Sequence, residues 1–433
     1  MASDNLETTP PTTPPQALPR LNTNLGFRLL LGLFAAALLI YSAVTIANAF
    51  IPGKSIKDYE LWYATGQQVL HGDAIYPPPH HKFPFMYPPA AALFLAPVAL
   101  LGKSGLVIAL VLVNAVAWTA CILLSTRIAT GEGKRAHLLL YLIPSAVIAV
   151  YAWSNFHLGQ PTLVLLALML GGFCALQRKR VIPAGALFAI AAAIKAFPFV
   201  ALVYLIYRRY WTAAAAMLAT LLFLLLALPA PFRGWQQTRA DLQRWTEGML
   251  LKYDDTGVAQ RPGRSNSWKN QSIVGVANRL LRHVDYDEQF AAHEARYTNI
   301  ADLSFATVNS IIAGTALLLG LIYITVMPRR ALRTRETDAL EFALFILLLL
   351  VVTPLAFGYL FASLLYPLTV VVHRLLVAPT RRLLTSAAFA GLLLAWTLPF
   401  QRQAQALGNT FFATLILFAG LALELWTLKR RLV

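Results

Sequence analysis

Charged residues are scarce in this chain. Only 13% of its 433 residues are Asp, Glu, Lys or Arg, whereas 58% are hydrophobic. Soluble domains carry roughly 25% charged residues, so an ordinary water-soluble domain is excluded. Apolar runs near the roughly 20 residues that a helix needs to cross the hydrocarbon core recur from Phe27 almost to the C-terminus. Because these runs are continuous and not alternating, they predict helices and exclude an outer-membrane barrel.

Cysteine and the common nucleotide and metal motifs are also rare or missing. Cys121 and Cys174 both lie inside apolar runs, which excludes a disulfide framework and a cysteine metal cluster. The sequence contains no Walker loop, no Rossmann glycine fingerprint and no HExxH. We interpret the adjacent acids Asp254 and Asp255 as a solvated pair in a polar loop. We therefore expect no cofactor, no bound metal and no nucleotide site.

The formal net charge of +17 comes from Lys and Arg in short clusters beside the apolar runs. Such clusters indicate membrane topology and not a nucleic-acid surface, so no nucleic-acid partner is expected. Clusters at 329–335, 373–382 and 429–431 mark alternate loops, which we predict to be cytoplasmic. Alternation then places two long polar stretches, 51–89 and 231–303, on the non-cytoplasmic face.

These patterns predict an all-α polytopic membrane protein with about twelve transmembrane segments. Residues 1–25, rich in Pro, Thr and Asn, are expected to form a disordered cytoplasmic tail, and 26–433 a single integral membrane domain. The first run should remain as an uncleaved anchor. The apolar runs lie at about 27–50, 90–101, 105–126, 137–152, 161–177, 183–207, 211–230, 304–327, 339–353, 358–377, 383–399 and 409–428.

The middle of the chain departs from simple alternation, which would place the basic cluster 178–180 outside. We therefore expect 90–101 to dip into the membrane without crossing it. We also expect the run 183–207 to break near Lys195 and Pro198, because proline removes a helix hydrogen bond. The break predicts a polar, discontinuous pocket beside the first outer loop.

Two charged residues stand out in this arrangement. Asp58 lies at the membrane surface among Tyr59 and Trp62, where partial desolvation can bring a carboxylate into the range of a general base. Lys195 lies within an apolar run, where an ammonium is costly and suits the phosphate of a lipid-linked donor. The competing interpretations are an interfacial acid or helix cap for Asp58, and a snorkelling side chain for Lys195.

Several weaker candidates lie beside the apolar runs. Gln160, Asn270 and Gln271 could hydrogen-bond sugar hydroxyls, although helix capping explains them nearly as well. Asn270-Gln271-Ser272 also fits a glycosylation sequon. Arg279 could bind a phosphate, although arginines at a membrane surface are ordinary.

Taken together, the sequence resembles glycosyltransferase family 87, membrane mannosyltransferases of the C-type superfamily that use polyprenyl-phosphate-mannose as donor. Three stretches carry the likeness over about residues 26–377. They are Asp58-Tyr59 with Tyr63, Gly66, Gly72, Tyr76, Tyr87-Pro88-Pro89 and Pro97; Gly159-Gln160 with Ala184-Gly185, Lys195, Pro198 and Arg208-Arg209-Tyr210-Trp211; and Asn270-Gln271-Ser272 with Arg279.

The resemblance implies a C-type glycosyltransferase fold with its active site on the periplasmic or extracytoplasmic side of the inner (plasma) membrane. The first outer loop of the family supplies the catalytic aspartate, which corresponds here to Asp58. An acceptor hydroxyl then attacks the sugar with inversion, and polyprenyl phosphate leaves without help from a metal. The expected partners are a polyprenyl-phosphate-sugar donor, a lipid or glycan acceptor and membrane lipids. Lys195 and Arg279 are expected on the donor phosphate, and Tyr59, Gln160, Asn270, Gln271 and Tyr359 on the substrates.

The sequence departs from the family after Thr353-Pro354, where relatives tend to carry Trp and His but this chain reads LAFGYL. Phe357 and Tyr359 stand near those positions and could preserve stacking on a sugar. Two other functions are compatible with the sequence. An O-antigen ligase or polymerase would be favoured by arginines in the outer loop 231–303, and a lipid-sugar transporter ranks third because the chain has no clear inverted repeat.

Overall fold

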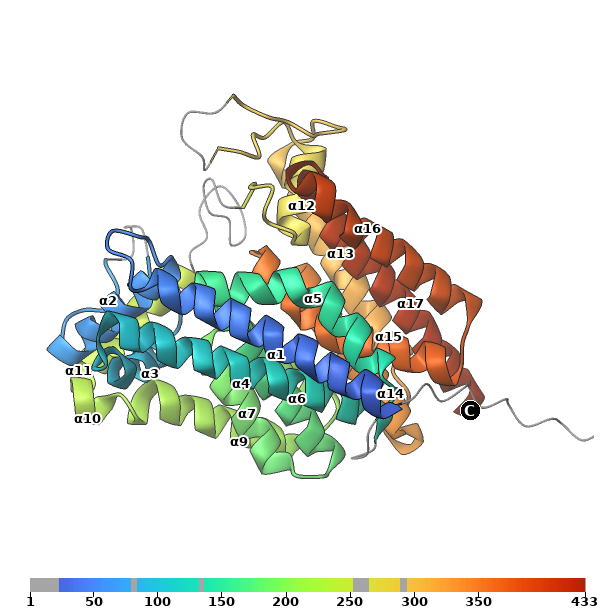
Figure 1. Ribbon diagram of the computed structural model, residues 1–433, viewed down its shortest axis with the longest axis horizontal. Helices are drawn as coiled ribbons and strands as arrows, with labels where there is room; N and C mark the ends of the chain where they lie inside the picture. Colours follow the sequence, from blue (N-terminus) through green and yellow to red (C-terminus); the bar gives the residue numbers. More distant parts are fainter. Residues whose placement is uncertain (1–22, 79–83, 132–135, 252–264, 289–293, 433) are drawn as a thin grey trace, which may run out of the picture.

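The computed structural model describes residues 23–78, 84–131, 136–251, 265–288 and 294–432. Within these ranges all regular secondary structure is helical (Figure 1), which confirms the predicted all-α class. Residues 1–22 of the expected N-terminal tail and the pair Asp254-Asp255 lie outside the described residues. The helices are α1 (Thr23–Asn48), α2 (Asp58–His71), α3 (Pro89–Ala99), α4 (Gly102–Thr130), α5 (Leu139–Leu158), α6 (Thr162–Gln177), α7 (Val181–Ile194), α8 (Ala201–Tyr207), α9 (Trp211–Leu222), α10 (Ala230–Arg233), α11 (Trp235–Trp245), α12 (Ile273–Leu281), α13 (Phe305–Val326), α14 (Arg335–Val352), α15 (Leu365–Val377), α16 (Arg381–Ala406) and α17 (Asn409–Leu432).

Eight helical segments of the described chain are long and apolar enough to cross a membrane. Four shorter apolar helices accompany them, and every apolar run found in the sequence contains a helix. The run at 339–353 forms α14, which is buried along most of its length among α13, α15 and α17. The chain is therefore a multi-pass membrane protein, while the exact number of crossings stays a prediction.

The middle region contains two irregular segments, and whether the first of them dips into the membrane without crossing stays a prediction. α3 has 11 residues, which at 1.5 Å per residue is about half of the roughly 30 Å hydrocarbon core. α7 ends at Ile194, Lys195 is extended, and a 3-10 turn, η1 (Phe197–Val200), precedes α8. The helix break predicted near Lys195 and Pro198 is thus confirmed.

The polar stretch 51–89 contains α2, which packs closely on α3. The acids Asp58 and Glu60 in the first turn of α2 interact favourably with the helix dipole, and Gly72 ends the helix in the left-handed conformation. Gly66 permits the close approach, because a Cβ there would lie 2.7 Å from the Cβ of Ala99. In Figure 1, α2 and α3 gather with α10 and α11 at one end of the bundle.

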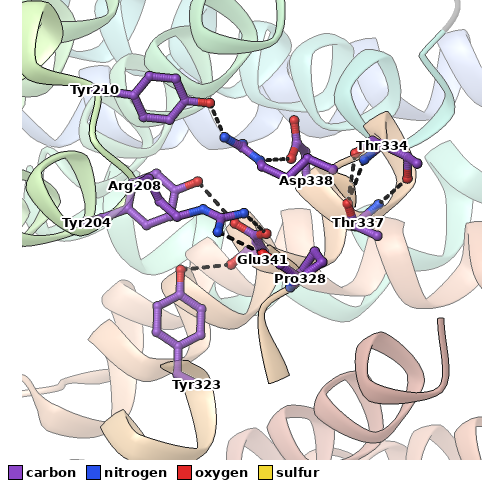
Figure 2. A network of polar contacts seen from close by, with 10 residues as sticks. Tyr204, Arg208, Tyr210, Tyr323, Pro328, Thr334, Thr337, Asp338 and Glu341 are labelled. Atoms are coloured by element: carbon purple, nitrogen blue, oxygen red, sulfur yellow. Dashed lines mark hydrogen bonds and ion pairs between the residues drawn. The ribbon is translucent and has the colours of Figure 1, made fainter. Parts of the chain in front are cut away.

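A buried polar cluster ties α8 to α13 and α14 (Figure 2). Arg208 forms an ion pair with Glu341 at 2.5 Å, and their side chains are 6% and 0% exposed. Arg208 also donates to the carbonyl of Pro328 at 2.9 Å, and the Tyr204 hydroxyl donates to Glu341 at 3.3 Å. Arg208, which follows α8, therefore links α8 to α14 and to the end of α13.

Candidate functional site

The candidate site begins at the first residue of α2. The Gln160 amide Nε2 donates to the Asp58 carboxylate Oδ2 at 2.5 Å, and the Tyr87 hydroxyl donates to Gln160 Oε1 at 2.9 Å. Because the Tyr87 proton occupies the amide oxygen, the amide nitrogen is turned toward Asp58. Burial raises the pKa of Tyr87, and the nearby Tyr359 and Asp58 raise it further, so the hydroxyl keeps its proton.

The helix α2 is fixed to the end of α5 by two aromatic side chains. The Tyr59 hydroxyl donates to the Phe156 carbonyl and the Trp62 indole to the Gly159 carbonyl, both at 2.7 Å. Gly159 has a φ of 74°, and a Cβ there would lie 3.0 Å from the Tyr59 ring. Tyr59 is 1% exposed, and burial raises its pKa. Tyr59 therefore links the first turn of α2, which carries Asp58, to α5, and its predicted contact with a substrate stays a prediction.

Lys195 faces the same site from the broken helix. Its ammonium lies 5.3 Å from the ring centroid of Tyr87 and 5.1 Å from that of Tyr359, within the range of cation–π attraction. It also lies within electrostatic range of Asp58. The break after α7 thus brings a cation to a site that already holds a carboxylate.

Tyr359 lies at the start of the 3-10 turn η5 (Gly358–Leu364) and is held by α5. Asn155 Nδ2 donates to the Tyr359 carbonyl at 2.9 Å and to the Tyr151 carbonyl at 2.8 Å. Asn155 is fully buried, and none of the residues that the structure describes donates a hydrogen bond to its Oδ1. Sequence reasoning missed Asn155, although an amide inside an apolar run could have drawn attention to it.

An apolar groove of about 360 Å³ adjoins the site. It lies among α3, α4, α6 and α7, and reaches the site at Trp62, Tyr87 and Gly159. Ile194, directly before Lys195, also lines it. The remaining lining is almost entirely aliphatic or aromatic: Phe85, Ala91, Phe94, Leu95, Val98, Leu110, Val113, Asn114, Pro161, Val164 and Ile190. The site thus combines the Asp58 carboxylate, the Lys195 ammonium and the apolar groove.

The other predicted residues form a separate cluster around α12. Asn270 Nδ2 donates to the Pro354 carbonyl at 3.0 Å, and its Oδ1 accepts from the Ala356 amide at 2.9 Å. Gln271 Nε2 donates to the Gln405 carbonyl at 2.7 Å. Asn270 therefore contacts the loop before Tyr359 and Gln271 the end of α16, and their predicted sugar contacts stay predictions.

Arg279 belongs to this cluster as well. It is fully buried, and its guanidinium donates to the carbonyls of Ala406, Ser267, Asn270 and Gln405 at 2.7–3.1 Å. The guanidinium donors of Arg279 are thus engaged by backbone carbonyls, and its predicted contact with the donor phosphate stays a prediction. The described residues hold no group of three or more His, Cys, Asp or Glu suited to a metal ion.

The chain is similar to a known family of glycosyltransferases. The family model of glycosyltransferase family 87 matches residues 85–354. A polyprenol-phosphate-mannose-dependent alpha-(1-2)-phosphatidylinositol mannoside mannosyltransferase of Mycolicibacterium smegmatis is 31% identical over 214 residues, which cover 46% of this chain and 44% of the relative. A protein of the same description from Mycobacterium tuberculosis is 29% identical over 222 residues, 48% of each chain. The matches thus span less than half the length of each relative.

Proposed function

Because the chain belongs to glycosyltransferase family 87, we propose that it transfers a hexose, expected to be mannose, from a polyprenyl-phosphate-sugar donor to a hydroxyl of a lipid or glycan acceptor. The observation that carries the proposal is the Asp58–Gln160–Tyr87 chain facing Lys195 at the mouth of the apolar groove. Asp58 and Tyr359 lie outside the residues that the family model matches, so their roles rest on this geometry.

In the proposed reaction Asp58 is the general base. It takes the proton of the acceptor hydroxyl as the oxygen attacks the anomeric carbon, and the carbon–oxygen bond to the donor phosphate breaks with its electron pair passing to the phosphate. Attack on the face opposite the phosphate inverts the anomeric configuration. The Gln160 amide stabilises the ionised carboxylate through a charge-assisted hydrogen bond.

The donor is recognised in two parts. Lys195 attracts the phosphate and neutralises the charge that develops on it as it leaves, which favours the transition state more than the ground state. The groove accommodates the first isoprene units of the lipid, because burial of apolar surface contributes about 25 cal/mol per Å². Tyr359, whose ring lies beside the Lys195 ammonium, offers an aromatic surface for the sugar.

The site is proposed to open on the extracytoplasmic face of the plasma membrane. The positively charged clusters at 329–335, 373–382 and 429–431 support this orientation. Two of the described arginines in the stretch that would favour a ligase or polymerase are engaged within the protein: Arg279 is held by backbone carbonyls, and Arg233 pairs with Asp241 at 2.8 Å.

The proposal is tested by incubating the purified full chain in lipid vesicles with a panel of labelled donors and extracted envelope lipids. Polyprenyl-phosphate-mannose should donate its sugar and GDP-mannose should not, and the product should have the anomeric configuration opposite to that of the donor. Failure of every polyprenyl-phosphate sugar, across a panel of acceptors, would exclude this function and favour a ligase or a transporter.

A further inference from the structure

Two exposed aromatic side chains lie where the apolar segment that begins with α9 ends. This segment, Trp211–Arg233, has 23 residues, so it is about 35 Å long at 1.5 Å per residue, slightly more than the roughly 30 Å hydrocarbon core. Phe232, in its last turn, is 74% exposed, and Trp235, two residues beyond its end, is 54% exposed. Aromatic side chains gather where a membrane meets water, so the length of the segment places both residues in that zone.

The helices that carry these two residues form one unit. Phe232 belongs to α10 and Trp235 to α11, and a single residue, Gly234, separates the two helices. Arg233 of α10 forms an ion pair with Asp241 of α11 at 2.8 Å, and both side chains are 1% exposed. Loss of one partner of a buried ion pair is strongly destabilising, so this contact holds the two helices in one arrangement. A displacement of either aromatic residue therefore moves α11 as a whole.

This unit also binds both arms of the loop between α2 and α3. Arg233 Nη2 donates to the Asp73 carbonyl at 2.7 Å, in the first arm of the loop. The indole Nε1 of Trp245, the last residue of α11, donates to the Met86 carbonyl at 3.2 Å, in the second arm. Met86 directly precedes Tyr87, the tyrosine of the proposed catalytic chain. The position of α11 therefore influences how Tyr87 is held.

We propose that Phe232 and Trp235 dock on the headgroup region of the bilayer, and that α10 and α11 thereby hold the loop of Tyr87 in its catalytic position. The partner is a phospholipid surface, because the two residues continue directly from a segment that is long and apolar enough to lie in lipid. The docking is independent of the reaction. The effect on the loop rests on the proposed function and makes Trp245 a positioning residue, since it acts through Tyr87.

Depth-dependent quenching tests the docking. The native Cys121 and Cys174 are buried, so a cysteine introduced by Phe232→Cys or Trp235→Cys can carry an environment-sensitive fluorophore in phosphatidylcholine vesicles. Either label should be quenched more by a lipid with a nitroxide near its headgroup than by a lipid with a nitroxide at the end of its acyl chain. A label in Leu318→Cys, at an exposed position near the middle of α13, should show the opposite order.

A polar position on the same helix provides the aqueous reference. Gln243 is exposed on α11, and a label in Gln243→Cys should be quenched by iodide in the water. Iodide quenching of the labels at Phe232 and Trp235 that is as strong as at Gln243 would overturn the docking. Fluorescence of those two labels that changes with the ratio of protein to lipid would also overturn it, because a second copy of the chain would then cover the residues.

The effect on the loop is measured by transfer of mannose from polyprenyl-phosphate-mannose in vesicles. The double variant Phe232→Ser/Trp235→Ser should lower kcat per folded molecule about fivefold, because the loop is held less well, while KM for the donor stays unchanged. Trp245→Phe keeps an aromatic ring but loses the hydrogen bond to Met86. It should lower kcat by a similar factor, and the labels at Phe232 and Trp235 should keep their quenching pattern in that background.

Two variants serve as controls for the rate. Phe232→Trp/Trp235→Phe keeps both aromatic residues and should retain the wild-type kcat. Trp211→Ser removes an exposed aromatic side chain from the other end of the same segment and should retain it as well. A wild-type kcat in the double serine variant, or an equal loss in Trp211→Ser, would overturn the effect on the loop. Wild-type protein that transfers no sugar would refute the proposed function and with it this effect, whereas the quenching results would still decide the docking.

Discussion

The orientation of the Asp58 carboxylate depends on one hydroxyl group and one side-chain amide. Tyr87 donates to Gln160, and Gln160 donates to Asp58, so the order of donors and acceptors along this chain is fixed by the tyrosine proton. The hydroxyl of Tyr76 donates in turn to the Tyr87 carbonyl at 2.5 Å. The carboxylate is thus oriented by groups in the loop between α2 and α3 as well as by α5.

Tyr87→Phe should lower kcat by about tenfold with a smaller change in KM, because a catalytic group held less well loses transition-state stabilisation. Without the tyrosine proton, the Gln160 amide can turn its oxygen toward Asp58. Steady-state transfer rates measure the effect. Tyr366→Phe removes another buried hydroxyl, which donates to the Ala339 carbonyl of α14 at 2.8 Å and not to Gln160, and should leave kcat unchanged. Equal effects of the two substitutions would argue against the proposed chain.

Lys195→Met should raise KM for the polyprenyl-phosphate donor and lower kcat, since the ammonium is proposed to act on the phosphate in both the ground state and the transition state. Lys195→Arg keeps the charge and should retain more activity. Rates at varied donor concentration separate the two parameters. If only the KM for the acceptor changed, Lys195 would bind the acceptor and not the donor.

At the scale of elements, the loop that carries Tyr359 is held from outside the site. The side chains of Asn270 and Ser272 both donate to the Pro354 carbonyl, and the backbone N–H of Gln271 donates to the Ala356 carbonyl at 2.8 Å. Three consecutive residues before α12 therefore hold Pro354 and Ala356, two of the three residues that precede Phe357. The motif is far from Asp58 in sequence but acts on the segment that faces Lys195.

Asn270→Ala should reduce both the thermal midpoint and kcat. The buried amide of Ala356 would lose its acceptor, at a cost of about 1–3 kcal/mol, and Tyr359 would be held less firmly. Asn278→Ala is the matched control, because Asn278 is also fully buried but bonds within α12 and to Arg282. It should lower stability with little effect on the rate per folded molecule, as measured by transfer assays normalised to the folded fraction. A kcat for Asn270→Ala equal to that of the control would remove this motif from the catalytic account.

Sequence reasoning was most successful where local chemistry decides the structure. Proline at 198 and lysine at 195 predicted the helix break because each is unfavourable in a continuous apolar helix. Gln160 was found as a polar group at a helix end, and the structure places it on Asp58. The surroundings of Arg279 could not be predicted from the sequence. Carbonyl groups of a distant segment, at Ala406, bind this arginine, and no local sequence pattern indicates that the segment lies there. Asn155 acts across about 200 residues of sequence.

At the scale of the whole molecule, buried charged side chains link distant parts of the chain. The Arg208–Glu341 pair joins α8 to α14, and nearby Arg333 pairs with Asp338 at 2.7 Å and donates to the Tyr210 hydroxyl (Figure 2). These contacts link the region that contains the groove to the region that contains α12 and α17. The cluster is spatially separate from Asp58 and Lys195, so it should affect stability and not the chemistry.

Arg208→Leu should destabilise the fold by about 3–5 kcal/mol, because it leaves Glu341 buried without its partner. The double variant Arg208→Leu/Glu341→Leu should recover much of that loss. Thermal unfolding in detergent measures both, and the rate per folded molecule should remain near that of the wild type. A double variant that is less stable than the single variant would show that the ion pair itself, and not the orphaned charge, supplies the stability.

Asp58 is proposed to be the base of a sugar transfer. A second acid in the first turn of α2, Glu60, provides a matched control for this role. Asp58→Asn and Glu60→Gln each remove one negative charge from the first turn of the same helix, but Glu60 pairs with Lys103 and its side chain is 47% exposed. We predict that Asp58→Asn lowers kcat for mannose transfer from polyprenyl-phosphate-mannose by at least about 100-fold, whereas Glu60→Gln retains the wild-type rate. Folded Asp58→Asn protein that transfers mannose at the wild-type rate would contradict the account.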